Sequence, residues 1–159
     1  MILVLDCIRK AQNLGAVMRL VLASNAQVYL TGDVLKHTHP KVKTQMQKWA
    51  RLPNFADIES LIDVKYADTL EELVSDFRAK GYRIIGTTPH TETIYTELDY
   101  TKDDFIMVFG TEVSGLSRAK LEMMDTKIKI PMLGNVDSLN LATSVAVITY
   151  EILRQREFK

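Results

Sequence analysis

The sequence predicts an α/β protein in which a parallel sheet is flanked by helices. Short apolar runs of strand length alternate along the chain with amphipathic segments of helical period. The clearest run, Phe105 to Phe109, is apolar at every position, as is typical of a central strand in a parallel sheet. Because no repeat, low-complexity tract or linker interrupts this alternation, we expect residues 1–159 to form one domain.

The first half of the chain begins with a buried strand, which the apolar run from Ile2 to Leu5 predicts. Asn13 to Ser24 places its apolar residues on one face of a helix, and Gln27 to Thr31 predicts the second strand. A basic helical segment runs from Pro40 to Trp49, since proline is tolerated in a first helical turn. A weaker strand is expected from Asp63 to Tyr66.

The second half continues with a helix whose start is marked by the capping-box pattern of Thr69 and Glu72 and whose end is marked by Gly81. A polar loop runs up to Thr101, and a short helix starts at Ser117. The remaining strands are expected at Arg83 to Thr87, Phe105 to Phe109 and Lys127 to Ile130. The last of them ends at Pro131, because proline has no N–H to donate to a neighbouring strand.

The last helix is expected to begin near Ser138, with Ser138 or Asp137 as its cap, and to run to Gln155. It carries two apolar lines, which are Leu141, Val145, Ile148 and Ile152, and Leu139, Ala142, Ala146 and Leu153. A helix that rests on one sheet needs a single apolar stripe. We therefore expect burial on two sides, against its own sheet and against a partner subunit.

The composition, with 47% apolar and 25% charged residues, is that of a soluble globular protein. No window approaches the roughly 20 uninterrupted apolar residues of a membrane span, and the run from Met1 to Leu5 is too short for the core of a signal peptide. The single Cys7 cannot form an internal disulfide, which favours a reducing compartment. A cytoplasmic protein is the resulting expectation.

The charges cancel overall, with 20 basic and 20 acidic side chains, which counts against binding of nucleic acid. Their distribution is uneven, because the stretch from Val34 to Ala56 contains no acidic residue. This stretch is either an RNA-binding surface or an ordinary solvated face. The candidate RNA-binding residues in it are Lys36, Lys41, Lys43, Lys48 and Arg51.

Three stretches carry candidate functional residues, and the first runs from Asn13 to Arg19. Gly15 in the first helical turn costs about 1 kcal/mol relative to alanine, which calls for a structural reason such as the close approach of another backbone. Arg19 lies beside the apolar face. The spacing alone fits a surface arginine whose stem packs down on the helix.

The second stretch, Phe109 to Ser117, is a glycine-bounded turn between a buried strand and a helix, where backbone N–H groups can meet a polar ligand. Gly110 and Gly115 have the spacing of a P-loop. Leu116, however, occupies the position of the phosphate-binding lysine, which argues against a nucleoside triphosphatase.

The third stretch, from Leu133 to Asn140, offers backbone amides, the Ser138 hydroxyl and the Asn140 amide. Asn140 sits within an apolar helix start, and a buried amide there must be hydrogen-bonded. A metal site is not expected, because His37 and His39 lack a Cys or a third His nearby.

These stretches resemble, in order, the three signatures of the SpoU (TrmH-like) branch of the SPOUT RNA methyltransferases. The matching positions are Asn13, Gly15 and Arg19 in the first signature, Phe109, Gly110, Glu112, Gly115 and Leu116 in the second, and Ile130, Pro131, Met132, Gly134, Ser138, Leu139, Asn140, Tyr150, Glu151, Arg154 and Gln155 in the third. The first signature departs from the family where Lys10-Ala11-Gln12 replaces the usual Asn-Pro and where Ser24-Asn25 replaces Phe-Gly.

The resemblance implies a SPOUT fold, in which the C-terminal segment forms a deep trefoil knot, and ribose 2′-O-methylation of RNA with S-adenosyl-L-methionine as donor. The residues that it implies for cofactor binding are Thr87, Gly110, Glu112, Ile130, Ser138, Leu139 and Asn140. Those that it implies for catalysis are Asn13, Arg19, Ser138 and Asn140. Arg19 is placed near the ribose hydroxyl, either as the base or as an electrostatic clamp.

The resemblance also implies a homodimer in which Arg19 of one chain reaches toward the cofactor of the other. Because small SpoU proteins that consist of the catalytic domain mostly modify transfer RNA, we expect tRNA as the substrate. The alternatives are methylation of ribosomal RNA and a non-catalytic RNA-binding dimer with the same fold.

Overall fold

The computed structural model describes residues 1–48 and 55–158, and it contains a six-stranded sheet in the order β3-β2-β1-β5-β4-β6. The strands are β1 (Ile2–Asp6), β2 (Gln27–Thr31), β3 (Asp63–Ala67), β4 (Arg83–Thr87), β5 (Phe105–Phe109) and β6 (Thr126–Ile128). The helices are α1 (Ala11–Ser24), α2 (Pro40–Gln47), α3 (Phe55–Glu59), α4 (Leu70–Ala79), α5 (Arg118–Glu122) and α6 (Leu141–Gln155), with a 3-10 turn η1 (Tyr95–Glu97). Every strand pair is parallel, which confirms the predicted fold class.

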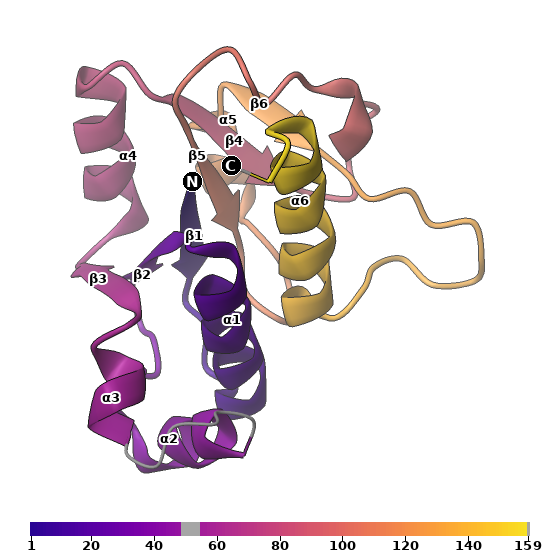
Figure 1. The fold of residues 1–159 in the computed structure, drawn as a ribbon. Coiled ribbons are helices and arrows are strands. Elements are labelled where there is room, and N and C mark those ends of the chain that lie inside the picture. The colour runs from indigo at the N-terminus through magenta and orange to yellow at the C-terminus, as the bar shows by residue number, and fades with distance from the viewer. Residues whose placement is uncertain (49–54, 159) are drawn as a thin grey trace.

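The central strand β5 is buried along its whole length, as its continuous apolar run predicts. Phe105, Met107 and Phe109 pack on one face of the sheet, whereas Ile106 and Val108 pack on the other. Helices α1 and α6 lie on the first face, and α2 and α3 extend the same core beyond the ends of the strands, where α2 packs on α1. Helix α4 covers the second face together with residues next to α5. Figure 1 shows α1 and α6 side by side in front of the sheet.

The strand order reverses between β1 and β5. From β1 the chain adds β2 and then β3 on one side, whereas β4, β5 and β6 lie on the other. In an open parallel sheet, ligands bind at such a reversal, beyond the carboxyl ends of the strands. The loops that follow β1, β4, β5 and β6 are therefore the ones that can form a site.

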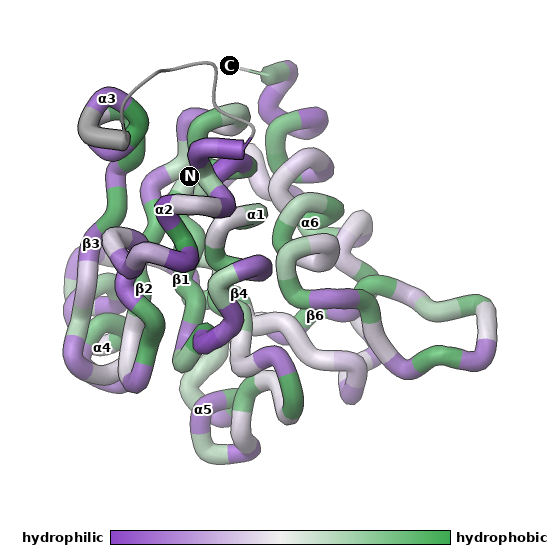
Figure 2. The backbone as a smooth tube through the Cα atoms, turned by 90° about the horizontal axis from the view of Figure 1, so that it is seen from below, coloured by the Kyte–Doolittle hydropathy of each residue, from purple (hydrophilic) through white to green (hydrophobic). Residues whose placement is uncertain are grey.

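Helix α6 begins later than predicted, and its cap is Asn140. The side-chain oxygen of Asn140 accepts hydrogen bonds from the backbone N–H groups of Ala142, at 3.0 Å, and Thr143, at 3.3 Å. The expectation that Ser138 or Asp137 would cap the helix is therefore wrong. Both belong to an exposed loop, residues 131–140, which projects from the body of the molecule in Figures 1 and 2.

The predicted last strand, Lys127 to Ile130, is also shifted, because β6 ends at Ile128. Lys129 pairs instead with Ile94 in an isolated parallel bridge. The bridge joins the segment after β6 to the loop between β4 and β5.

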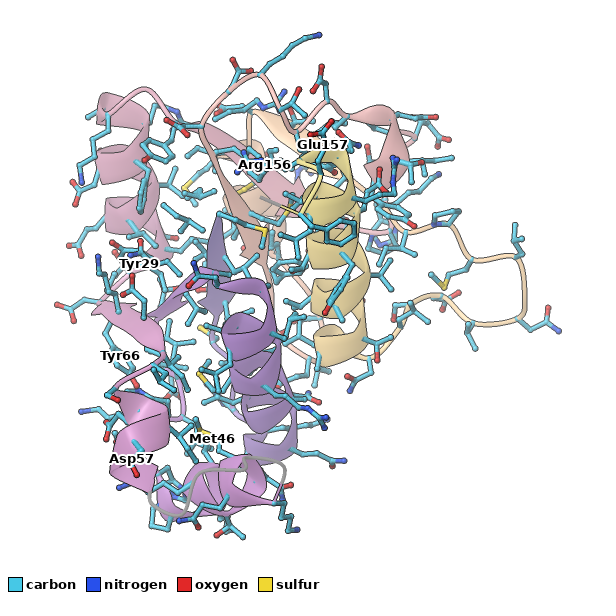
Figure 3. All side chains as sticks on the ribbon, in the orientation of Figure 1. Tyr29, Met46, Asp57, Tyr66, Arg156 and Glu157 are labelled. Carbon is cyan, nitrogen blue, oxygen red and sulfur yellow. The ribbon has the colours of Figure 1, made fainter. Side chains whose placement is uncertain are left out.

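The C-terminal end of α6 is fastened to the loop between β4 and β5. Gln155 accepts a hydrogen bond from the Tyr100 N–H and donates one to the Leu98 carbonyl, both at 3.0 Å. Arg156 donates to the Tyr100 carbonyl at 2.9 Å, and Figure 3 shows its place at the end of the helix. These bonds fix the helix over the sheet. The predicted trefoil knot stays a prediction.

The second apolar line of α6 is only partly covered. Ala142, Ala146 and Leu153 are half-buried. Leu139, predicted to belong to this line, lies before the helix in the 131–140 loop and is 37% exposed. Within the described residues, no helix has both the length and the apolar character that crossing a membrane requires.

Candidate functional site

A cavity of about 380 Å³ lies where the loops after β4, β5 and β6 meet the first turns of α6. Its volume is within the range of small-molecule sites, roughly 300 to 1,000 Å³. The apolar part of its wall includes Leu116, Ile128 and Ile148. Hydroxyl groups come from Thr88, Ser138 and Ser144. The second and third candidate stretches thus share one cavity.

The loop after β5 is folded tightly by its two glycines. Thr111 and Gly115 exchange backbone hydrogen bonds of 3.2 Å in both directions. A Cβ atom on Gly110 would lie 2.1 Å from the carbonyl carbon of Gly115, so only glycine fits there. Gly115 itself has a φ of 66°, in the left-handed region that glycine adopts readily. The tight fold of the loop therefore brings its backbone close to the cavity.

Glu112 connects this loop to the start of α1. One oxygen of its carboxylate accepts hydrogen bonds from the backbone N–H groups of Lys10, at 2.9 Å, and Arg9, at 3.3 Å. It also accepts from the side-chain amide of Asn13 at 3.4 Å. Glu112 lines the cavity, as expected for a cofactor-binding residue, but its carboxylate is already occupied in orienting the first candidate stretch.

Asn13 and Asn140 complete a hydrogen-bonded chain through all three stretches. The side-chain N–H of Asn140 donates to the side-chain oxygen of the buried Asn13 at 2.9 Å. The amide of Asn140 is hydrogen-bonded as predicted, although the residue is exposed and not buried. Neither asparagine lines the cavity. In this chain they hold α1, the β5–α5 loop and α6 in a fixed relation.

Replacing Asn140 with alanine is expected to lower the free energy of unfolding by about 1–2 kcal/mol, because α6 loses its cap. The loss of the bond to Asn13 adds to this effect. Urea denaturation measures the change. Ser138→Ala is the matched control, and we expect it to stay within about 0.5 kcal/mol of the unmodified chain. An equal effect of the two substitutions would show that Asn140 is not the cap.

The predicted cofactor-binding residues mostly lie together. Those that line the cavity are Thr87, Gly110, Glu112, Ile130, Ser138 and Leu139, whereas Asn140 lies next to it. Sequence reasoning missed His90 and Lys129, which also line it. Their positions in the sequence could have identified them as lining residues, because His90 follows a predicted strand and Lys129 directly precedes Ile130.

Arg19 does not line the cavity of its own chain. It is exposed on α1, on the same face as Gln12, Ala16 and Ala23. Helix α1 as a whole packs beside α6.

The basic segment forms the loop before α2 and the helix itself. Lys36, Lys41 and Lys48 are exposed and Lys43 is half-buried, while Arg51 lies outside the described residues. Helix α2 packs closely on α1, since a Cβ atom on Gly15 would lie 2.6 Å from the Gln45 Cβ. A close approach occurs at Gly15, but the approaching group is the Gln45 side chain and not another backbone as expected.

The histidines near α2 have structural contacts. His39 accepts a hydrogen bond from the Lys41 N–H at the start of α2. His37 contacts the Tyr66 hydroxyl at 2.6 Å and the Glu59 carboxylate at 3.2 Å (Tyr66 is labelled in Figure 3). In the described part of the chain, no three His, Cys, Asp or Glu side chains gather as metal ligands would.

Comparison with known proteins gives a consistent result. A family model of the SpoU rRNA Methylase family matches residues 1–150. A putative tRNA (cytidine(34)-2′-O)-methyltransferase of Bacillus subtilis is 34% identical over 151 residues, which cover 92% of this chain and 88% of that protein. An uncharacterized tRNA/rRNA methyltransferase of Synechocystis is 32% identical over 155 residues, 97% of this chain. The chain spans about half, 53%, of the Synechocystis protein.

Solved structures with a similar fold are also known. One, described as giving insights into the 2-OH methylation of C/U34 on tRNA, superposes with a TM-score of 0.81 at 28% identity. The superposition covers 99% of this chain and 97% of that one.

Proposed function

The chain belongs to the SpoU rRNA Methylase family, and on that premise we propose that it methylates the ribose 2′-oxygen of RNA with S-adenosyl-L-methionine as donor. The observation that carries the proposal is the convergence of the family's three signature stretches. Two of them form one cavity, and the first is tied to both others through Asn13.

The cavity fits the donor in size and chemistry. Leu116, Ile128 and Ile148 offer apolar contact, and the backbone of the glycine-bounded loop offers hydrogen-bonding groups. The donor supplies a methyl group that is already reactive, on a sulfonium. The chain has mainly to align the ribose oxygen and to stabilise the charge that develops as its proton leaves.

Arg19 is the residue assigned to this charge stabilisation. A guanidinium has five N–H donors and no acceptor, and proteins do not deprotonate it near neutral pH. It therefore acts as a cation that clamps the neighbouring phosphate and stabilises the developing alkoxide. A role as general base is less favourable on these grounds.

A homodimer with shared sites is part of the proposal. Arg19 does not line its own chain's cavity, so a second chain is needed to bring it to a donor. Helix α6 packs beside α1 and carries the half-buried Ala142, Ala146 and Leu153, while Leu139 is exposed in the loop just before it. Tyr150, 47% exposed on α6, adds aromatic surface to this region.

Transfer RNA is the favoured substrate. The Bacillus relative of nearly the same length and the solved structure both have tRNA in their names, and the Synechocystis relative has tRNA and rRNA. The exposed cations Lys36, Lys41 and Lys48 lie around α2, beyond the carboxyl end of β2. Phosphate contacts there would make RNA binding strongly dependent on salt.

The test is methyl transfer by the purified chain from labelled donor to tRNA and, separately, to 23S rRNA. We expect incorporation into tRNA, mapped to a ribose by methylation-sensitive sequencing. Incorporation only into rRNA would show that the substrate is rRNA and not tRNA. A calorimetric titration with S-adenosylhomocysteine that shows no binding would leave the non-catalytic RNA-binding dimer as the better account.

A further inference from the structure

Lys129 is the one Lys or Arg on the cavity wall, among the residues that the structure describes. The other ionisable residues that line the cavity are His90, Glu112 and Asp137. We propose that Lys129 binds an anionic oxygen group of the ligand in this cavity. This inference rests on the proposed function and names one contact within it.

The backbone of Lys129 is held at a fixed point on the wall. Its N–H donates to the Thr93 carbonyl, and its carbonyl accepts from the Tyr95 N–H, both at 2.9 Å. The bridge with Ile94 fastens it to the loop after β4. The side chain is 24% exposed. The base of the lysine side chain is therefore fixed at the cavity wall.

The present partner of Lys129 is easily replaced. Its ammonium lies 3.3 Å from a carboxylate oxygen of Glu92, whose side chain is fully exposed. Ion pairs with exposed partners contribute little to stability, because water and salt compete with them. The carboxylate of Glu112, by contrast, is bound by backbone N–H groups. A ligand anion can therefore replace Glu92 as the partner of Lys129 at little cost in free energy.

The charges around the cavity match a zwitterionic ligand. The donor's amino-acid portion carries one carboxylate, and its ammonium and sulfonium are cations. Asp137 and Glu112 provide negative charge on the wall, and Lys129 provides the positive charge. A phosphodiester of the RNA is the second possible source of an anionic oxygen, and an ammonium binds either as a point charge.

The experiment compares Lys129→Gln with the unmodified chain, using calorimetric titration with S-adenosylhomocysteine and with 5′-methylthioadenosine. The second compound shares the adenosine and the sulfur but lacks the amino-acid carboxylate. If the carboxylate is the partner, we expect affinity for S-adenosylhomocysteine to fall about tenfold, while affinity for methylthioadenosine changes less than about twofold.

If the RNA phosphate is the partner, both affinities stay unchanged and the KM for RNA rises about tenfold. Lys127→Gln is the matched control, since Lys127 is a neighbouring lysine that does not line the cavity, and it is expected to leave both affinities unchanged. Equal weakening of both compounds, or no change in any of the three measurements, would overturn the inference. A wild-type chain that binds neither compound would contradict the proposed function instead.

Discussion

Replacing Gly110 with alanine is expected to weaken binding of S-adenosylhomocysteine more than tenfold and to lower the free energy of unfolding by about 2–4 kcal/mol. The new Cβ would lie 2.1 Å from the Gly115 carbonyl carbon and 2.2 Å from the Leu116 nitrogen. Both are backbone atoms, so no side-chain rotation relieves the overlap. The loop has to open, and the hydrogen bonds between Thr111 and Gly115 are lost.

Calorimetry and urea denaturation measure the two effects. Gly134→Ala is the matched control, because no atom lies within 4 Å of the Cβ that it adds. Gly134 belongs to the projecting loop, and its replacement is expected to change the free energy of unfolding by less than about 0.5 kcal/mol. A Gly110→Ala chain that binds S-adenosylhomocysteine with the wild-type affinity would show that the β5–α5 loop does not form the binding site.

The fold class was predictable because hydrophobic periodicity is a local property. The apolar run at β5 predicted a buried strand, and the amphipathic pattern at α1 predicted a helix, and the structure contains both. The start of α6 was not predicted correctly, because the sequence offers three good capping residues within four positions: Asp137, Ser138 and Asn140. Asn140 is selected by its bond to Asn13, 127 residues earlier, and no local pattern contains that contact.

For the candidate site, too, the sequence predicted the segments involved but not the contacts between them. The family motifs identified which loops meet, and six predicted cofactor-binding residues line one cavity. The motifs did not reveal that Glu112 holds the start of α1 or that Lys129 brings the cation, because both depend on chain segments that approach only in the folded state. Long-range hydrogen bonds are the part of a site that sequence spacing cannot supply.

Replacing Arg19 with alanine is expected to lower kcat at least a hundredfold, the usual cost of removing one group that stabilises transition-state charge. Affinity for S-adenosylhomocysteine should change less than about twofold, because the role proposed for Arg19 is toward the ribose oxygen and the RNA phosphate and not toward the donor. Arg19→Lys keeps the charge and should retain measurable turnover, whereas a strict geometric role would make it as inactive as alanine. Gln12→Ala, on the same exposed face of α1, is the control and should keep wild-type turnover.

Mixing two inactive chains tests whether the site is shared. Ser144 lines the cavity from α6, so Ser144→Phe should fill the cavity of its own chain while leaving Arg19 intact. In a heterodimer with an Arg19→Ala chain, one site combines an intact cavity with an intact arginine. Random pairing makes half of the dimers mixed, so activity should return to about one quarter of the wild-type value. If each chain completed its own site, the mixture would stay inactive, and Arg19 would have to act by a route other than a partner's cavity.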